Sequence, residues 1–207
     1  MIKSLSLTLL LLAVVGCASR VDSTRFYVLG PVTGTPAAGR PAALGRDLRV
    51  GIRSVELPRY LERAQIVTRA SANRLELAEF HQWGAPLRLT LPGVLAENLA
   101  RLIPSEQVLV FPWGRTFEPD AQVRVEVSRL EGALGGESVL VARWRIVGRN
   151  GNEVDSGNSR FSEATGPDYE SLVATHSRLL GALSQDIAEG LRRSVKEASA
   201  GETRPSR

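Results

Sequence analysis

Cysteine, histidine and lysine are all scarce in this chain. Among its 207 residues there are one cysteine, Cys17, two histidines, His81 and His176, and two lysines, Lys3 and Lys196. A single cysteine excludes a disulfide framework within the chain and a zinc site built from several thiolates. Two histidines exclude a histidine-rich metal centre. We therefore expect neither a metal nor another bound cofactor.

The charge is small and spread out. The formal net charge is +4, and the positive residues, nearly all of them arginine, form no block along the sequence. A dedicated nucleic-acid-binding domain concentrates such charge in a patch, so this distribution argues against a nucleic-acid partner. With 43% hydrophobic and 23% charged residues, the composition is that of an ordinary globular protein with one sizeable core.

The N-terminus has the pattern of an export signal. Lys3 provides a positive charge, and residues 5–15 form an apolar run that is shorter than the ~20 residues needed to span a bilayer. The run ends in Val-Val-Gly directly before Cys17, a pattern that resembles the lipobox of bacterial lipoproteins. In such proteins the cysteine receives lipid and becomes the new N-terminus. We therefore predict that residues 1–16 are a lipoprotein signal peptide and that Cys17 is the site of lipid attachment.

Lipidation would hold the protein at a membrane. Several acyl chains such as palmitate, at ~0.8 kcal/mol per buried CH₂, bind firmly where one chain binds reversibly. Ala18 follows the cysteine, whereas an aspartate at that position retains many bacterial lipoproteins in the inner membrane. We therefore predict an anchor in the outer membrane, on its periplasmic face, with residues 17–25 as a tether.

Alternating apolar residues predict most strands of the mature chain. Residues 26–29 are apolar, and their two aromatic side chains favour a strand that joins the sheet over a place in a solvated linker. The Gly- and Pro-rich residues 30–46 follow as a flexible loop. Further strands are expected near residues 48–53, 66–68, 75–77, 108–111, 123–128, 140–146 and 154–161. The Asn-Gly pair at 150–151 is a strong hairpin signal, so the last three strands form an antiparallel meander.

Two amphipathic helices are expected. Residues 86–103 carry apolar residues at spacings of three and four, although Pro92 leaves open a later start at that residue. Residues 166–197 begin with Gly-Pro-Asp and carry a long apolar stripe. Together the elements predict an α/β fold, a single domain over residues 26–198 with a mixed β-sheet, an antiparallel meander and two principal helices, followed by a disordered tail over residues 199–207.

No known catalytic motif is present. The sequence lacks a nucleophile elbow, a P-loop, a dinucleotide-binding glycine pattern and a zinc-protease helix motif. His176 falls on the apolar stripe of the second helix, where a core histidine with one hydrogen bond is expected more often than a base or a ligand. His81 is the better catalytic candidate, because its aromatic surroundings at residues 80–83 are expected to form a loop. Neither histidine has an evident nucleophile or acid beside it, so we predict no enzyme.

Two stretches of sequence resemble a known family. Residues 55–69, VELPRYLERAQIVTR, are similar to the V-x-L-P-x-Y-L-x-R-x-x-I-V-x-R signature of the ABC-type transport auxiliary lipoproteins (PqiC/YmbA-like). Residues 80–87, FHQWGAPL, resemble the family's W-x-x-P-L pattern ahead of a helix with an L-x-x-N-L pattern, here LAENL at 95–99. Ala85 departs from the glutamate common in the family. The residues that form either structural corners or partner contacts are Pro58, Tyr60, Leu61, Trp83, Pro86 and Leu87.

The resemblance implies an α/β fold and a non-enzymatic periplasmic subunit of an MCE-type transport system. Such systems move lipids or other hydrophobic compounds between two membranes and support envelope integrity, and the implied partner is the MCE-domain protein, reached by docking. Two alternatives stay open. One is a stand-alone lipid or hydrophobic-ligand binder, which needs a sizeable apolar pocket between helix and sheet, and the other is an enzyme that uses His81 or His176. A homo-oligomer also stays open.

Overall fold

The structure, a computed structural model, describes residues 23–32, 48–103, 105 and 107–202, with side chains up to residue 196. The predicted signal peptide, Cys17 and most of the predicted loop at 30–46 lie outside the described residues. Within the described ranges, no helix combines the length and hydrophobicity needed to cross a membrane.

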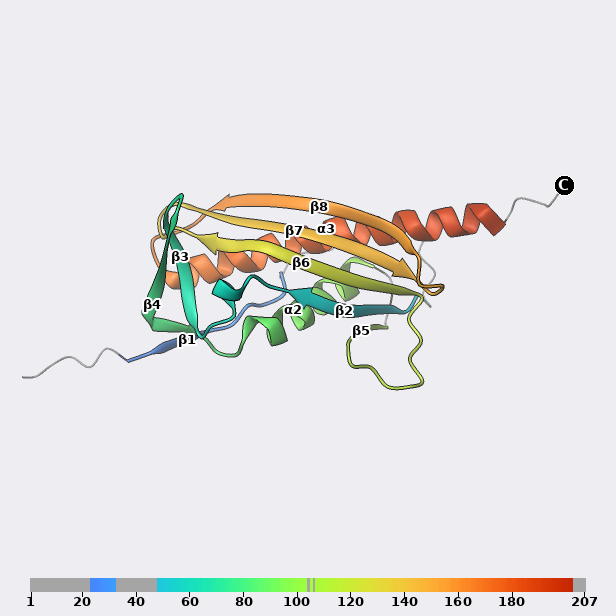
Figure 1. Ribbon diagram of the computed structural model, residues 1–207, viewed down its shortest axis with the longest axis horizontal. Helices are drawn as coiled ribbons and strands as arrows, with labels where there is room; N and C mark the ends of the chain where they lie inside the picture. The colour runs from blue at the N-terminus through green and yellow to red at the C-terminus, as the bar shows by residue number, and fades with distance from the viewer. Residues whose placement is uncertain (1–22, 33–47, 104, 106, 203–207) are drawn as a thin grey trace, which may run out of the picture.

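The described residues contain eight strands in one mixed sheet (Figure 1). The strands follow the order β1-β4-β3-β6-β2-β5, while β7 pairs with β6 and β8 pairs with β7. This confirms the predicted α/β class with a mixed sheet. Their bounds are β1 Arg25–Tyr27, β2 Val50–Glu56, β3 Gln65–Ser71, β4 Arg74–Trp83, β5 Val108–Val110, β6 Ala121–Gly132, β7 Glu137–Gly148 and β8 Glu153–Ala164.

The 12-residue strand β6 holds the sheet together. One edge pairs antiparallel with β7, while the other pairs in parallel with β2 at residues 121–126 and with β3 at Gly132. Val123, Val125 and Val127 are buried, and the polar residues between them are exposed, as their alternation predicts. β6 therefore joins the parallel part of the sheet to the meander.

The predicted antiparallel meander is confirmed in β6, β7 and β8. The Asn-Gly pair lies in the turn between β7 and β8, where Gly151 has a φ of 81°, in the left-handed region that glycine tolerates. The amide of Gly148 donates to the carbonyl of Asn152 at 2.9 Å across this turn. Gly135, with a φ of 68°, has the same role between β6 and β7.

Strand β1 joins the sheet, as predicted for residues 26–29. It pairs in parallel with the end of β4, with Tyr27 opposite Trp83, and Leu29 just after it is buried in the core. The paired residues lie 56 positions apart in the sequence, and β1 forms an edge of the sheet.

The first residues of the predicted loop at 30–46 are held by both helices. The amide of Gly30 donates to the Ser177 hydroxyl at 3.3 Å. The amide of Val32 donates to Oδ1 of Asn98 at 3.0 Å. Asn98 is the asparagine of the L-x-x-N-L pattern, so this family residue positions the chain that leaves β1.

The helix α2 (Leu87–Leu102) starts directly after Pro86 and not at Pro92. Pro92 lies inside the helix, where it removes one internal hydrogen bond, the one that the Arg88 carbonyl would accept. Its side chain is buried. The short helix η2 (Arg59–Leu61) forms the turn between β2 and β3.

The helix α3 (Tyr169–Glu202) begins as predicted after the Gly-Pro-Asp sequence. The Asp168 carboxylate accepts a hydrogen bond from the Ser171 amide at 2.8 Å and so caps the helix. The helix continues past its predicted end near residue 197, because residues 197–200 are Glu-Ala-Ser-Ala and include good helix formers without a proline. Residues 199–202 therefore belong to α3 and not to the predicted tail.

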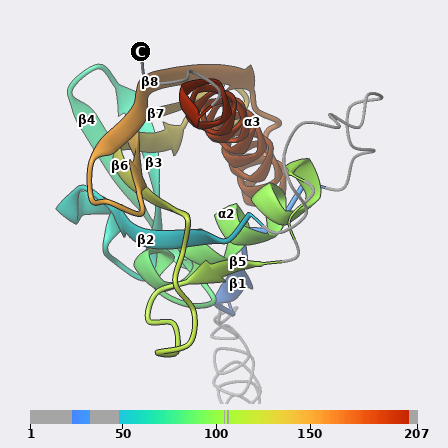
Figure 2. The same ribbon diagram turned by 90° about the vertical axis from the view of Figure 1, so that its right-hand side faces the viewer.

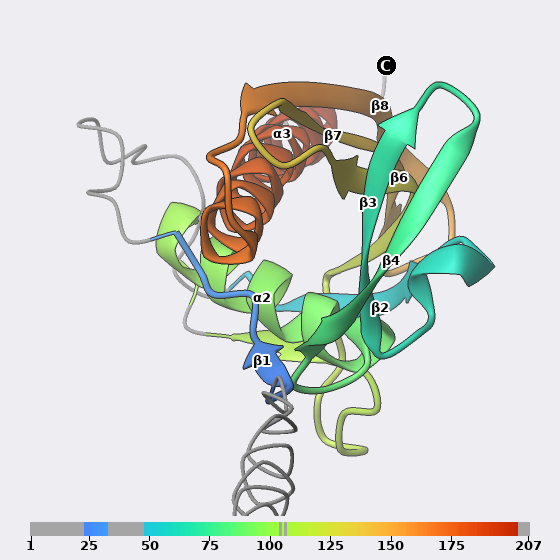
Figure 3. The same ribbon diagram turned by 90° about the vertical axis from the view of Figure 1, so that its left-hand side faces the viewer.

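The two helices close the curled sheet when the domain is viewed end-on (Figures 2 and 3). Helix α3 packs along β6, β7 and β8, helix α2 packs against β2 and β5, and the helices contact each other. Fully buried leucines and isoleucines fill the space between them. The main ones are Leu91, Leu95, Leu99, Leu130, Leu140, Ile146, Leu172, Leu180 and Leu183.

Trp144 of β7 lies against two glycines that let other elements approach it. A Cβ atom added at Gly157 of β8 would lie 2.5 Å from the indole, and one added at Gly190 of α3 would lie 2.7 Å from it. The indole N–H donates to the Ser159 hydroxyl at 3.0 Å. The close contact between α3 and the sheet at this point therefore depends on the absence of a side chain at Gly190.

Gly190→Ala should destabilise the fold by about 1–3 kcal/mol, even though alanine favours a helix by ~1 kcal/mol. Gly93→Ala in α2 is the matched control, because a Cβ there would meet no atom within 4 Å. The control should be stabilising by roughly 0.5–1 kcal/mol. Chemical denaturation of both variants checks the difference, and equal effects would contradict the packing role of Gly190.

Candidate functional site

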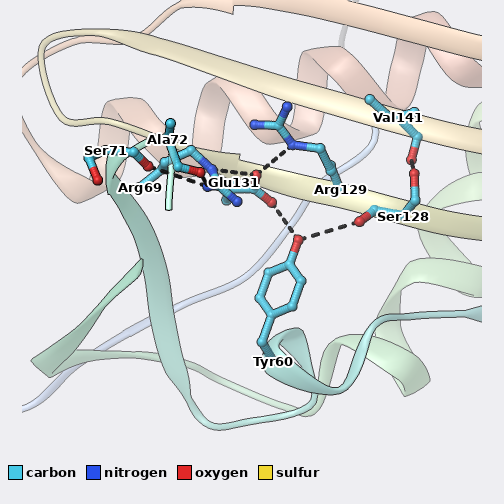
Figure 4. Close-up of polar contacts among 8 residues, drawn as sticks. All are labelled: Tyr60, Arg69, Ser71, Ala72, Ser128, Arg129, Glu131 and Val141. Carbon is cyan, nitrogen blue, oxygen red and sulfur yellow. Dashed lines mark hydrogen bonds and ion pairs between the residues drawn. The ribbon is translucent and has the colours of Figure 1, made fainter. Parts of the chain in front are cut away.

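Two polar residues of the 55–69 signature, Tyr60 and Arg69, meet at Glu131, a buried residue of β6 (Figure 4). Oε2 of Glu131 accepts a hydrogen bond from the Tyr60 hydroxyl at 2.6 Å. Oε1 accepts from Nε of Arg69 at 2.9 Å and from Nε of Arg129 at 2.8 Å. We call these four residues the Glu131 cluster. Sequence reasoning identified Tyr60 as a motif residue but missed Glu131.

Three elements bring the cluster together. Pro58, with a φ of −64° and a ψ of 143°, ends the extended segment after β2 and leads into η2. Leu61 of η2 is buried in the core, which holds Tyr60 over β6. The pairing of Thr68 with Gly132 then sets β3 beside the end of β6 and places Arg69 next to Glu131.

The cluster is built around an ionised carboxylate. Burial opposes ionisation of Glu131, but the hydrogen bonds from Tyr60, Arg129 and Arg69 outweigh it, and the pKa of Glu131 lies below its ordinary value. Burial and the bond to Glu131 raise the pKa of Tyr60 well above its ordinary value. Because both carboxylate oxygens already accept hydrogen bonds, the cluster is suited to joining strands rather than to removing a proton from a substrate.

The second family stretch also forms a corner of the fold. Trp83 at the end of β4 is buried, with its ring centroid 6.4 Å from that of His176. Pro86 is exposed directly before α2, and Leu87 behind it is buried. Of the motif candidates, Leu61, Trp83 and Leu87 are thus enclosed, which favours a structural role for them over direct contact with a partner.

The prediction of a loop around His81 is wrong, because residues 80–83 form the end of β4. The strand extends this far because β1 supplies a partner on one side and Gln65 of β3 pairs with Gln82 on the other. Nδ1 of His81 lies 2.7 Å from the Tyr27 hydroxyl, and its ring stacks on Tyr169 with a centroid separation of 3.9 Å. Partial burial and the charge of Arg25 lower the pKa of His81. Its surroundings are therefore those of an aromatic cluster.

His176 is a core residue, as predicted, but the single hydrogen bond expected for it is not made. Its side chain is buried in the apolar stripe of α3, and among the described residues neither ring nitrogen has a hydrogen-bond partner. Burial lowers the pKa of His176 to about 4, against a smaller opposing effect of Glu131. The ring is therefore neutral at neutral pH.

The part of the chain that the structure describes holds no group of three or more His, Cys, Asp or Glu side chains placed to bind a metal. It does hold an apolar hollow of about 610 Å³, between the C-terminal half of α3 and the neighbouring ends of β6, β7 and β8. Its apolar lining comes from Leu48, Ala121, Val154, Leu191 and Val195.

The chain forms a single α/β domain, and its two sequence motifs form corners of the fold. The sequence profile described as ABC-type transport auxiliary lipoprotein component matches residues 27–188. The chain therefore belongs to this family, and the resemblance found in the sequence is confirmed. No curated protein matches it significantly.

Solved structures show the same fold. A protein of Xanthomonas campestris superimposes with a TM-score of 0.68 at 13% sequence identity, over 85% of this chain and 99% of that one. A second structure, described as an uncharacterized protein, has a TM-score of 0.66 at 19% identity, over 82% of this chain and 99% of the other. At these identities the likeness establishes the fold alone.

Proposed function

We propose that this chain is an outer-membrane-anchored periplasmic lipoprotein that serves an MCE-type transport system by docking to its MCE-domain protein. In this role it supports the transport of lipids or other hydrophobic compounds, and with it the integrity of the envelope, without catalysis. The observation that carries the proposal is the family match over residues 27–188, since the family consists of auxiliary components of ABC-type transport. Cys17 after an export signal supplies the anchor, and Ala18 favours the outer membrane.

The described side chains support a role without catalysis. Both oxygens of the buried Glu131 carboxylate are occupied by its neighbours. His81 is engaged with two tyrosines, and His176 is enclosed in the core. A catalytic histidine would need an orienting acid and a nucleophile within hydrogen-bond reach, and the contacts of these two histidines are of another kind.

Cys17→Ser should abolish metabolic labelling with palmitate and release the protein from the outer-membrane fraction, because the serine cannot form the lipid thioether. Labelling and sucrose-gradient fractionation of whole cells measure both effects. Ser19→Ala, two residues further on, is the matched control and should keep both properties. Normal labelling and fractionation of the Cys17→Ser protein would refute the anchor.

Docking is tested with a purified MCE-domain protein from the organism that encodes this chain. The purified partner should retain the mature protein, and it should also retain the Cys17→Ser protein, because the folded domain and not the lipid makes the contact. Failure of the purified partner to bind either form would refute docking while leaving the anchor intact.

A stand-alone lipid binder is the second candidate, and the apolar hollow beside α3 is the observation that favours it. Val154 lines this hollow and is 40% exposed, so a charge there is tolerated by the fold. Native mass spectrometry of the purified protein should show no stoichiometric lipid if docking is its function. Bound lipid that is lost in Val154→Asp would favour the binder instead.

A further inference from the structure

The three most exposed large apolar side chains among the described residues lie close to the start of the domain. Val28 is 71% exposed, Phe26 is 67% exposed and Leu89 is 61% exposed. Phe26 belongs to β1. Val28 is the first residue after β1, and its side chain lies next to Gly84, just past the end of β4. Leu89 is in the first turn of α2, which begins just after Gly84. We call these three residues the N-terminal patch.

Phe26 and Val28 point away from the interior of the domain. The side chain of Tyr27 between them contacts His81 and Tyr169 on the side of α3. Because successive side chains of a strand face opposite sides, its two neighbours face outward. The exposure of both residues agrees with this direction.

The predicted anchor is close to this patch. Cys17 lies eight residues before Arg25, the first residue of β1. Eight residues reach at most about 26–29 Å when fully extended and typically about 14–17 Å as a flexible chain. A lipid on Cys17 would therefore keep the outer face of β1 near the bilayer surface, where even a weak contact is favoured by its high local concentration.

An exposed arginine, Arg88, directly precedes Leu89 in α2. Arg25, also exposed, directly precedes Phe26 in β1 but shares the face of Tyr27, where its charge acts on His81. Guanidinium groups next to apolar side chains suit the interface of a bilayer, where they meet anionic headgroups while the apolar groups enter the acyl boundary. The chemistry of the patch therefore matches a phospholipid surface.

We propose that the N-terminal patch rests on the membrane that carries the lipid anchor, with the phospholipid surface as its occupant. The inference rests on the lipidation of Cys17 proposed above. It gives the domain a defined orientation. The end of α3 and the turn between β7 and β8 lie at the opposite end of the molecule from β1 (Figure 1) and so face away from the membrane, towards a partner in the periplasm.

The single native cysteine makes a direct test available. Once lipid occupies Cys17, Phe26→Cys or Val28→Cys provides the only free thiol for an environment-sensitive fluorophore. Val154→Cys is the matched control, since Val154 is also an exposed apolar residue but lies beside the turn at the far end. The lipidated proteins are reconstituted in vesicles of phosphatidylethanolamine and phosphatidylglycerol that contain a nitroxide-labelled lipid.

Quenching by the nitroxide should be several-fold stronger at positions 26 and 28 than at position 154. Equal quenching at all three positions in protein shown by mass spectrometry to carry lipid overturns the inference and leaves the proposed function intact. Absence of lipid on Cys17 overturns the anchor and the inference together. Thermal denaturation of each labelled variant, compared with the parent protein, verifies that β1 remains folded.

Discussion

Glu131→Gln should lower the free energy of unfolding at pH 7 by about 2–3 kcal/mol. The amide keeps the shape of the side chain but removes the charge to which Arg69, Arg129 and Tyr60 donate hydrogen bonds. Removing one partner of a buried ion pair costs ~3–5 kcal/mol. We expect less here, because the arginine side chains keep 26% and 33% of their surface exposed and remain partly solvated. Urea denaturation measures the difference.

Glu163→Gln provides the matched control on the same sheet. Glu163 of β8 pairs with Arg178 of α3, but 38% and 48% of these side chains are exposed. Such a surface pair contributes about 0–1 kcal/mol. A loss at Glu131 no larger than the loss at Glu163 would contradict the structural importance of the Glu131 cluster.

The pH dependence gives this prediction a second, independent readout. The pKa of Glu131 is lower in the folded protein than in the unfolded chain, so its stabilising effect is present above the unfolded pKa of about 4.5. The effect is lost as the pH falls through the folded pKa. The difference in stability between the wild type and Glu131→Gln should therefore shrink in acid, and a constant difference between pH 7 and pH 3 would argue against an ionised Glu131.

The elements with a regular apolar period were predictable from the sequence. The alternation at Val123, Val125 and Val127 specifies one buried face of β6. The stripe that includes Leu179, Leu183 and Ile187 specifies the buried face of α3. In both cases a repeated local pattern decides the structure, so no knowledge of distant partners is required.

The end of β6 was not predictable in this way. The register of β6 against β7 shifts between Val127 and Arg129, and three successive residues, Leu130, Glu131 and Gly132, are then buried. A period of two cannot indicate that a glutamate in such a run is enclosed. The partners of Glu131 are also distant, since Tyr60 and Arg69 come from η2 and β3. The 55–69 motif contains Tyr60 and Arg69, two members of the cluster. Their common acceptor, Glu131, is brought to them only by the tertiary pairing of the strands.

The misplaced loop at His81 has the same origin. Residues 80–83 carry no alternation of their own and precede a proline, which is typical of a loop. They become a strand because β1, from the start of the domain, pairs with them on one side and Gln65 of β3 pairs with Gln82 on the other. Pairing with a distant three-residue edge strand leaves no local sequence pattern in the residues with which that strand pairs.

His176→Leu should abolish most of the loss of stability that the wild type undergoes between pH 7 and pH 4. In the native state burial holds the pKa of His176 at about 4, below the ordinary histidine value of 6.5. Between these values the unfolded chain binds a proton that the folded chain excludes, so acid favours unfolding. A difference of this size corresponds to about 3 kcal/mol, and leucine, which does not titrate, should abolish that contribution. Denaturation curves at half-unit steps of pH measure it.

Leucine at position 176 should also be tolerated at neutral pH. This is expected for a histidine with a purely structural role but not for a functional one. It fills the apolar stripe of α3 without bringing two ring nitrogens into a site where no described residue bonds to them. His81→Gln is the control and should change the acid dependence less, because His81 is less enclosed. If His176→Leu instead kept the full acid loss, the buried ring would not be its source. If it folded normally but lost binding to the MCE-domain protein, His176 would have a role beyond the core, and docking without a functional histidine would be wrong.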